Sequence, residues 1–149
     1  MPLIQHTALV PIPAQQMYEL VNCIEAYPEF LPYCKSAKIK EQKDNVVIAS
    51  LEIVKDPIRK SFTTRNTLTP PDSIMIELLD GPFEYLRGHW QFIALEDNAC
   101  KVNFTLDFAF KNKLFSAVSK PLLNYIANDM VKAFIKRAGS TTNKINQQG

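Results

Sequence analysis

A stretch near residue 105 alternates large apolar side chains with smaller or polar ones, and this pattern constrains the fold more than any other feature. Its large apolar members are Val102, Phe104, Leu106, Phe108 and Phe110. Side chains two apart on a strand point to the same face, so this face needs a cover. Residues 114–138 follow with apolar side chains at helical spacing. We therefore expect a sheet that grips one long helix, with large side chains facing a core or a ligand cavity.

Seven segments in all carry strand patterns bounded by turn residues. They are residues 4–10, 37–42, 46–54, 61–68, 74–79, 86–94 and 101–110. Short turns such as Asp44-Asn45 separate the last six, so consecutive strands should pair as an antiparallel meander. Pro13 begins a short amphipathic helix after the first strand, and a second short helix with a loop is expected near residues 27–34. The order predicts an α+β architecture, in which a strongly bent antiparallel sheet of six or seven strands surrounds the terminal helix.

Glycine and proline mark three further positions. Gly88 inside a strand pattern predicts a bulge or bend where the sheet curls. Pro121 falls within the long helix, so either the helix kinks there or its regular part begins near Lys120. Gly139 is a stop signal. We expect residues 1–139 to form a single domain and residues 140–149 to form a flexible polar tail.

The composition of the 149 residues, 46% hydrophobic and 21% charged, is ordinary for a globular domain. No run approaches the roughly 18 apolar residues that span a bilayer, and the N-terminus lacks the layout of a secretory signal. We expect a cytoplasmic bacterial protein, or one that meets the inner membrane only at its surface. The three cysteines fit neither a disulfide framework nor a metal-ligand spacing, so we expect no metal site.

Charge is distributed unevenly along the chain. Residues 1–110 carry ten Lys or Arg and fourteen acidic residues, whereas residues 111–149 carry seven basic residues and a single acid. Lys132 and Lys136 lie one helical turn apart, and Arg137 is adjacent, so an anionic partner such as RNA or phospholipid could bind this surface. A solvated helix face that complements the helix dipole would show the same pattern.

Catalysis has weak support in the sequence. His89 and Asp107 fall on strands that should be neighbours, and a His–Asp pair can perform acid–base chemistry. One loosely placed pair, without a nucleophile motif or a metal cluster, is more typical of a cross-strand contact. We therefore expect a protein that is not an enzyme and requires no cofactor.

Several motifs together resemble the coenzyme Q-binding protein family. They include Val10-Pro-Ile-Pro-Ala14, Tyr27-Pro-Glu-Phe-Leu-Pro-Tyr-Cys34, Gly81-Pro-Phe83, Trp90-Gln-Phe92, and Met130-Val131 with Ala133-Phe134. This family belongs to the helix-grip group of START-like and polyketide cyclase-like domains, and its bacterial members include the ribosome association toxin RatA. The resemblance covers all but about the last ten residues. The chain departs from the family pattern at Tyr33, where tryptophan is expected, and at Pro121.

On pattern alone the inward-facing side chains form a core, but the resemblance implies a cavity between sheet and helix that binds ubiquinone or another polyprenyl lipid in support of respiratory electron transport. The expected cavity residues are Phe62, Trp90, Phe92, Phe104, Leu106, Phe108, Leu122, Ile126, Met130 and Phe134. The expected lid residues are Tyr27, Phe30, Leu31 and Tyr33; they could equally plug one end of the sheet. The alternative implied by the resemblance is a toxin of a toxin–antitoxin pair, which binds the large ribosomal subunit, blocks subunit association and has a small antitoxin protein as partner.

Overall fold

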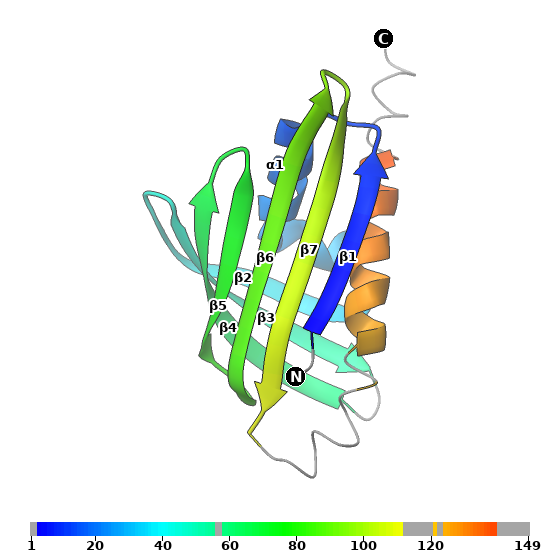
Figure 1. Ribbon diagram of the computed structural model, residues 1–149. Helices are drawn as coiled ribbons and strands as arrows, with labels where there is room; N and C mark the ends of the chain where they lie inside the picture. Colours follow the sequence, from blue (N-terminus) through cyan, green and yellow to red (C-terminus); the bar gives the residue numbers. More distant parts are fainter. Residues whose placement is uncertain (1–2, 56–57, 112–120, 122–123, 140–149) are drawn as a thin grey trace.

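A computed structural model describes residues 3–55, 58–111, 121 and 124–139 (Figure 1). The strands are β1 (Leu3–Val10), β2 (Cys34–Lys43), β3 (Val46–Lys55), β4 (Ile58–Thr69), β5 (Ser73–Asp80), β6 (Phe83–Glu96) and β7 (Ala99–Phe110). The helices are α1 (Ala14–Asn22), the 3-10 helix η1 (Ile24–Ala26), α2 (Tyr27–Phe30) and a C-terminal helix over residues 124–139. The predicted α+β architecture is confirmed. The expected first turns of the long helix and the tail over 140–149 lie outside the described residues.

The seven strands form one antiparallel sheet in the order β1-β7-β6-β5-β4-β3-β2. Strands β2 to β7 follow one another as the predicted meander, with only two or three residues between the end of one strand and the start of the next. The first strand then closes against the last, with Leu3 opposite Asp107 and Val10 opposite Cys100. As Figure 1 shows, α1 and the C-terminal helix lie on the same side of the curved sheet.

Of the bulge or bend predicted at Gly88, the bulge is absent, and the bend stays a prediction. Gly88 pairs in register with Ile76 on β5 and with Leu106 on β7. The irregularities of β6 lie at its ends, between Phe83 and Tyr85 and again between Ala94 and Glu96. A Cβ at Gly88 would lie 3.4 Å from the side chains of Ile76 and Leu106. These two neighbours on the inner face therefore approach Gly88 closely and leave room for little more than a methyl group.

Gly81 occupies the predicted turn between β5 and β6, and here glycine is required. Its φ is +156°, and a Cβ at this position would lie 2.8 Å from the Cβ of Phe62. Other residues rarely adopt this backbone conformation, and the contact leaves no room for a side chain. The turn between β5 and β6 therefore packs closely against Phe62 of β4.

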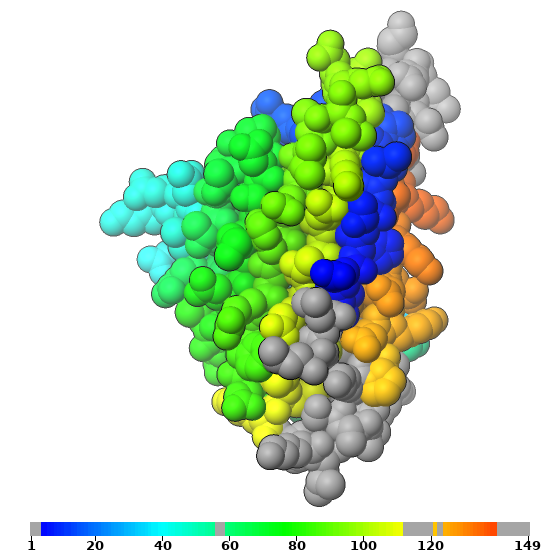
Figure 2. Space-filling model, in the orientation of Figure 1, coloured from blue at the N-terminus to red at the C-terminus, as the bar shows by residue number. Residues whose placement is uncertain are grey.

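The hydrophobic core lies between the inner face of the sheet and the helices. From α1 it takes Met17, Tyr18 and Val21. From the C-terminal helix it takes Ile126, Val131, Phe134 and Ala138. A second, smaller cluster around Phe83, Phe108 and Phe110 fills the opposite end of the sheet. Figure 2 shows the outer face, where β1, β7, β6 and β5 present their other side chains to solvent. None of the described helices is both long and apolar enough to cross a bilayer.

Candidate functional site

A cavity of about 150 Å³ separates the two core clusters, between the inner face of the sheet and the C-terminal helix. Strands β3 to β7 form its wall, while η1, α2 and the C-terminal helix cover it. Its lining consists of Ile24, Tyr27, Ala49, Leu51, Ile53, Phe62, Thr64, Asn66, Ile76, Phe83, Leu86, Trp90, Phe104, Leu106, Ile126, Ala127, Met130, Val131 and Phe134. Such a concave, mostly apolar space with a few polar groups is typical of a small-molecule site.

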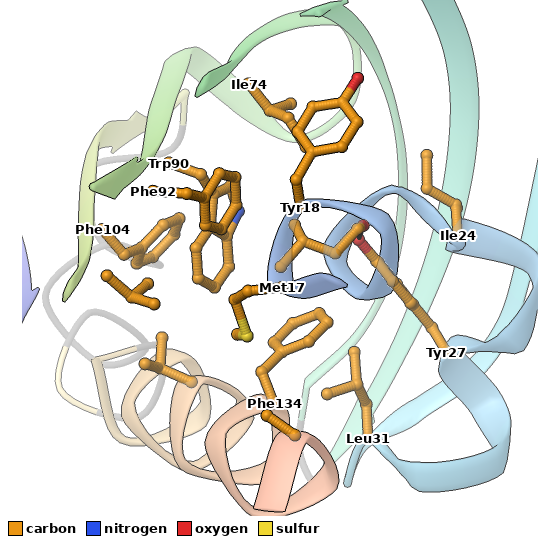
Figure 3. Close-up of a cluster of buried hydrophobic side chains, with 14 of the residues drawn as sticks. Met17, Tyr18, Ile24, Tyr27, Leu31, Ile74, Trp90, Phe92, Phe104 and Phe134 are labelled. Atoms are coloured by element: carbon orange, nitrogen blue, oxygen red, sulfur yellow. Dashed lines mark hydrogen bonds between the residues drawn. The ribbon is translucent and has the colours of Figure 1, made fainter. Parts of the chain in front are cut away.

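Three aromatic rings from three elements meet at one side of this cavity. The ring of Trp90 on β6 lies 4.4 Å from that of Phe104 on β7 and 5.2 Å from that of Phe134 on the C-terminal helix, centroid to centroid. Figure 3 shows Trp90 and Phe104 projecting from the sheet toward Phe134 and toward Met17 of α1. Alternation along β6 and β7 aims both sheet residues inward, and the helix supplies the ring that closes against them.

The structure brings most of the predicted cavity residues together. Those found in the lining are Phe62, Trp90, Phe104, Leu106, Ile126, Met130 and Phe134. Leu122 lies outside the described residues. Phe92 and Phe108 are buried, at 2% and 0% exposure, but they do not line the cavity.

Their positions along the strands explain this. Phe92 lies nearer the α1 end, where Tyr18 packs edge-on at 6.0 Å between ring centroids. Phe108 lies toward the other end, 6.2 Å from Phe83 and 5.9 Å from Phe110. Both side chains point inward as predicted. Tyr18 of α1 packs against Phe92, and Phe83 and Phe110 pack against Phe108, so neither ring borders the cavity.

The predicted lid residues join the sheet to the C-terminal helix. Tyr27 lines the cavity, donates a hydrogen bond to the carbonyl oxygen of Val21 and packs edge-on against Phe134 at 5.1 Å. Phe30 contacts Phe134 at 5.5 Å, and Leu31 is buried in the same cluster. Of these three residues Tyr27 is in the cavity lining, and the role of all three as a lid that opens or touches lipid stays a prediction.

Tyr33 differs from the other lid residues because its hydroxyl bonds directly to the C-terminal helix. Its φ is +68°, and its hydroxyl donates a 2.8 Å hydrogen bond to Oδ2 of Asp129 on the C-terminal helix. This bond, followed by burial, raises the pKa of Tyr33 above its ordinary range. The Nζ of Lys55 lies 4.7 Å from the same ring, so Tyr33 connects β3 with the helix beside the cavity.

Two polar residues in the lining, Thr64 and Asn66, were not predicted. They lie on the inner face of β4 together with Phe62 and Leu68, and they are 7% and 8% exposed. The outer face of this strand is also polar, at Thr63, Arg65 and Thr67. Because polar residues occur on both faces, alternation alone did not identify Thr64 and Asn66 as buried. The available signal was that polar residues occupy both faces in the middle of a strand.

The cavity offers few groups for proton transfer. Tyr27 is the one titratable side chain in the lining described above, and burial raises its pKa well above the ordinary value. In the described part of the chain, no three His, Cys, Asp or Glu side chains gather as metal ligands. His89 faces the outer side with Met75 and Thr105 beside it, whereas Asp107 lies opposite Arg87 and accepts a hydrogen bond from Tyr85. His89 and Asp107 are thus not direct cross-strand partners.

The predicted anionic-partner surface lies on the outward side of the C-terminal helix. Lys132 and Lys136 are exposed, and they are one turn apart on the same face. Arg137 is partly buried, with its guanidinium carbon 5.1 Å from the centre of the Phe30 ring. We call Lys132 and Lys136 the basic helix face.

Comparison with known proteins places the chain in a family. Residues 10–135 match the family described as "Polyketide cyclase / dehydrase and lipid transport". The chain is 46% identical over 138 residues to the ribosome association toxin RatA of Escherichia coli K12, covering 93% of this chain and 87% of that protein. It is 33% identical over 132 residues to the mitochondrial coenzyme Q-binding protein COQ10 of Drosophila melanogaster, covering 86% of this chain and 54% of that one.

The fold has a close structural counterpart as well. A START superfamily protein from Mycobacterium smegmatis superimposes with a TM-score of 0.79 at 19% identity, covering 93% of this chain and 98% of that one. At this identity the similarity establishes the helix-grip fold alone. The relatives named above carry the names of a toxin and of a binding protein. Sequence and fold agree, and the chain belongs to the RatA and coenzyme Q-binding protein family of START-like, polyketide cyclase-type domains.

Proposed function

We propose that this protein is a non-enzymatic carrier of a hydrophobic ligand, a ubiquinone or a related polyprenyl lipid, and that it supports respiratory electron transport. The observation that carries the proposal is the apolar cavity between the sheet and the C-terminal helix. The name of the Drosophila relative, a coenzyme Q-binding protein, supports the same ligand class. Because burial of each methylene contributes about 0.8 kcal/mol, even a short prenyl segment would bind favourably in such a lining.

The chemistry of the lining supports carriage rather than conversion of the ligand. General acid–base catalysis needs a group that exchanges protons near the operating pH. Tyr27 is held in its neutral form by burial, and its hydroxyl already donates to Val21. The other described lining residues are apolar, apart from the amide of Asn66 and the hydroxyl of Thr64.

A second candidate function is that of a toxin that binds the large ribosomal subunit and blocks its association with the small one. Identity of 46% to RatA favours it. Exposed Lys132 and Lys136 would contact ribosomal RNA phosphates, so binding would weaken steeply as salt increases. The same face could lie on the anionic inner membrane, where each basic residue contributes about 1 kcal/mol. Both roles would place the protein in the cytoplasm, and the toxin role adds an antitoxin protein as partner.

One pair of variants separates the two roles. Ala49→Phe adds a ring inside the cavity, since Ala49 is 2% exposed and lies in the lining. Met75→Phe adds the same ring on the outer face, where Met75 is 44% exposed, and serves as its control. The ligand role predicts that purified wild-type protein and Met75→Phe yield quinone on solvent extraction, whereas Ala49→Phe yields none.

The ribosome role is tested on sucrose gradients of separated subunits at moderate and high salt. The toxin role predicts that the protein travels with the large subunit and depletes the assembled ribosome, and that Lys132→Glu with Lys136→Glu abolishes both effects. Ala49→Phe should behave like wild type in this assay. If the wild-type protein remains at the top of every gradient, the toxin role is excluded.

A further inference from the structure

Two buried polar side chains stand out in the otherwise apolar wall of the cavity. Thr64 and Asn66 are the buried polar residues of the described chain, and both line the cavity. They are two positions apart on β4, so their side chains point to the same inner face. Both are more than nine-tenths buried.

This polar pair holds more hydrogen-bond donors than partners. The Thr64 hydroxyl donates a 2.9 Å bond to Oδ1 of Asn66, which uses one of the three donor hydrogens on the two side chains. If the amide is turned the other way, Asn66 donates to Thr64 and two donors again remain. The residues opposite Asn66 on the adjacent strands, Val47 and Ile76, carry no side-chain acceptor.

The residues opposite Thr64 likewise carry no side-chain acceptor. Its opposite neighbours are Ala49 on β3 and Leu78 on β5, and neither side chain can accept a hydrogen bond. Buried polar groups in proteins are nearly always paired, and the spare donors of Thr64 and Asn66 belong to side chains that line the cavity, where an occupant can reach them. Valine and leucine would occupy these positions of a strand at lower cost. An occupant of the cavity that presents an acceptor would pair with these donors.

The size of the cavity indicates which part of a ligand lies there. A dry cavity of 150 Å³ lined by apolar side chains accommodates a benzene-sized molecule, and the present cavity has about that volume. A whole polyprenyl quinone is far larger. Trp90, Phe104 and Phe134 supply ring faces and edges on which a planar ring can pack.

We infer that the cavity binds the ring of a carbonyl-bearing ligand, with Asn66 and Thr64 donating hydrogen bonds to a ring carbonyl oxygen while the prenyl chain extends toward the outside. This inference rests on the proposed ligand-binding function and adds the orientation and chemical class of the ligand. A quinone satisfies it, whereas a hydrocarbon of the same shape leaves the donors unpaired. Asn66 and Thr64 are then the residues that determine specificity.

A matched pair of ligands tests the inference. Duroquinone and durene are a tetramethylated quinone and hydrocarbon that differ by the two carbonyl groups, and full substitution of the duroquinone ring prevents addition of cysteine thiols. Trp90 is the single tryptophan and lies in the lining, so duroquinone binding can be followed as quenching of its fluorescence. Durene binding is measured by its competition with duroquinone. The quantity compared is the ratio of the two dissociation constants.

Asn66→Leu and Thr64→Val keep the shape of each side chain and remove its donors. We expect Asn66→Leu to weaken duroquinone binding about tenfold, the loss expected for one hydrogen bond, while durene affinity stays within about twofold. Thr64→Val should also weaken duroquinone binding relative to durene binding, by a smaller factor than Asn66→Leu. Thr64→Val retains a β-branched strand residue, which keeps the test usable if Asn66→Leu does not fold.

Two outcomes overturn the inference, and they are distinguishable. If both variants change duroquinone and durene affinity by equal factors, the polar pair does not recognise a carbonyl, although the cavity still binds ligands. If neither compound binds the folded wild-type protein, the proposed ligand-binding function fails together with the inference. Circular dichroism confirms that each variant compared is folded.

Discussion

Replacing Phe134 by alanine tests how the C-terminal helix is held against the sheet. Phe134 is 4% exposed. Its ring centroid lies 5.1 Å from that of Tyr27, 5.5 Å from Phe30 and 5.2 Å from Trp90, each nearly edge-on. No other described side chain of this helix makes three aromatic contacts of this kind. The substitution therefore removes one ring that joins the helix to both α2 and β6.

The expected loss of unfolding free energy follows from these contacts. Removing a fully buried phenylalanine ring from the core costs about 2.5 kcal/mol in transfer free energy. Three edge-to-face pairs at the low end of their range contribute about 1.5 kcal/mol more. The sum, about 4 kcal/mol, lies within the range measured for Phe→Ala in protein cores. Tyr27 and Trp90 cannot move into the gap easily, because Tyr27 is hydrogen-bonded to Val21 and Trp90 packs on Phe104.

Urea unfolding followed by far-UV circular dichroism measures this loss. With a slope of about 2 kcal/mol per M, the midpoint of Phe134→Ala should fall by about 2 M. Lys132→Ala is the control on the exposed side of the same helix and should change stability by less than about 0.5 kcal/mol. A loss for Phe134→Ala no larger than that of the control would refute the conclusion that this ring fastens the helix to the sheet.

Three further predictions follow from glycine, thiol and phenol groups. Gly88→Ala should raise Tm by about 2 °C, because its Cβ would make contacts at 3.4 Å and the unfolded chain would lose entropy. In native protein at pH 8, Ellman's reagent should react quickly with exposed Cys23 and slowly with Cys34 and Cys100, because burial raises the pKa of Cys34 to about 11 and raises that of Cys100. Burial also raises the pKa of Tyr27, so only the unfolded chain loses this proton just above pH 10, and the free energy of unfolding should fall there.

Each of these predictions has a contradicting result. A lower Tm for Gly88→Ala would mean that Ile76 and Leu106 cannot accommodate even a methyl group. Fast reaction of all three thiols would mean that the sheet opens readily around Cys100. For Tyr27, the stability of wild type should fall by about 1 kcal/mol more than that of Tyr27→Phe between pH 10 and 11, because the unfolded tyrosine goes from half to almost fully deprotonated over this range. Equal slopes would show that this hydroxyl is accessible in the folded state.

The sheet could be predicted from the sequence because its strands alternate and its turns carry strong signals. All seven predicted strands are present in the predicted order, and their ends differ by a few residues, as with β4, which begins at Ile58 rather than Ser61. The role of Gly88 could not be predicted. A strand glycine can mark either a bulge or a close approach by neighbouring side chains, and only the positions of Ile76 and Leu106 decide between them.

The position of the cavity could be predicted from the sequence only in part. Alternation identifies which side chains face inward, but it does not say where along the strand an empty space remains. Phe104 lines the cavity, whereas Phe108, two inward positions further along β7, packs in a filled cluster. Thr64 and Asn66 also could not be assigned, because their burial depends on cover supplied by helices from distant parts of the chain. Sequence specifies the wall, while the three-dimensional packing determines which part of it is left uncovered.

The pairing of β1 with β7 has a consequence for how the chain is made. Residues 3–10 are synthesised before the other strands of the sheet, yet the described strand with which they pair is the segment around residues 100–107. At typical rates of about 5–20 residues per second, β1 waits roughly 5 to 20 seconds before β7 has been polymerised. During this interval the inward side chains of Ile4 and Val10 have no strand to pack beside. The nascent chain must therefore keep β1 unpaired until β7 has emerged, and the pairing of β1 with β7 can form only after that.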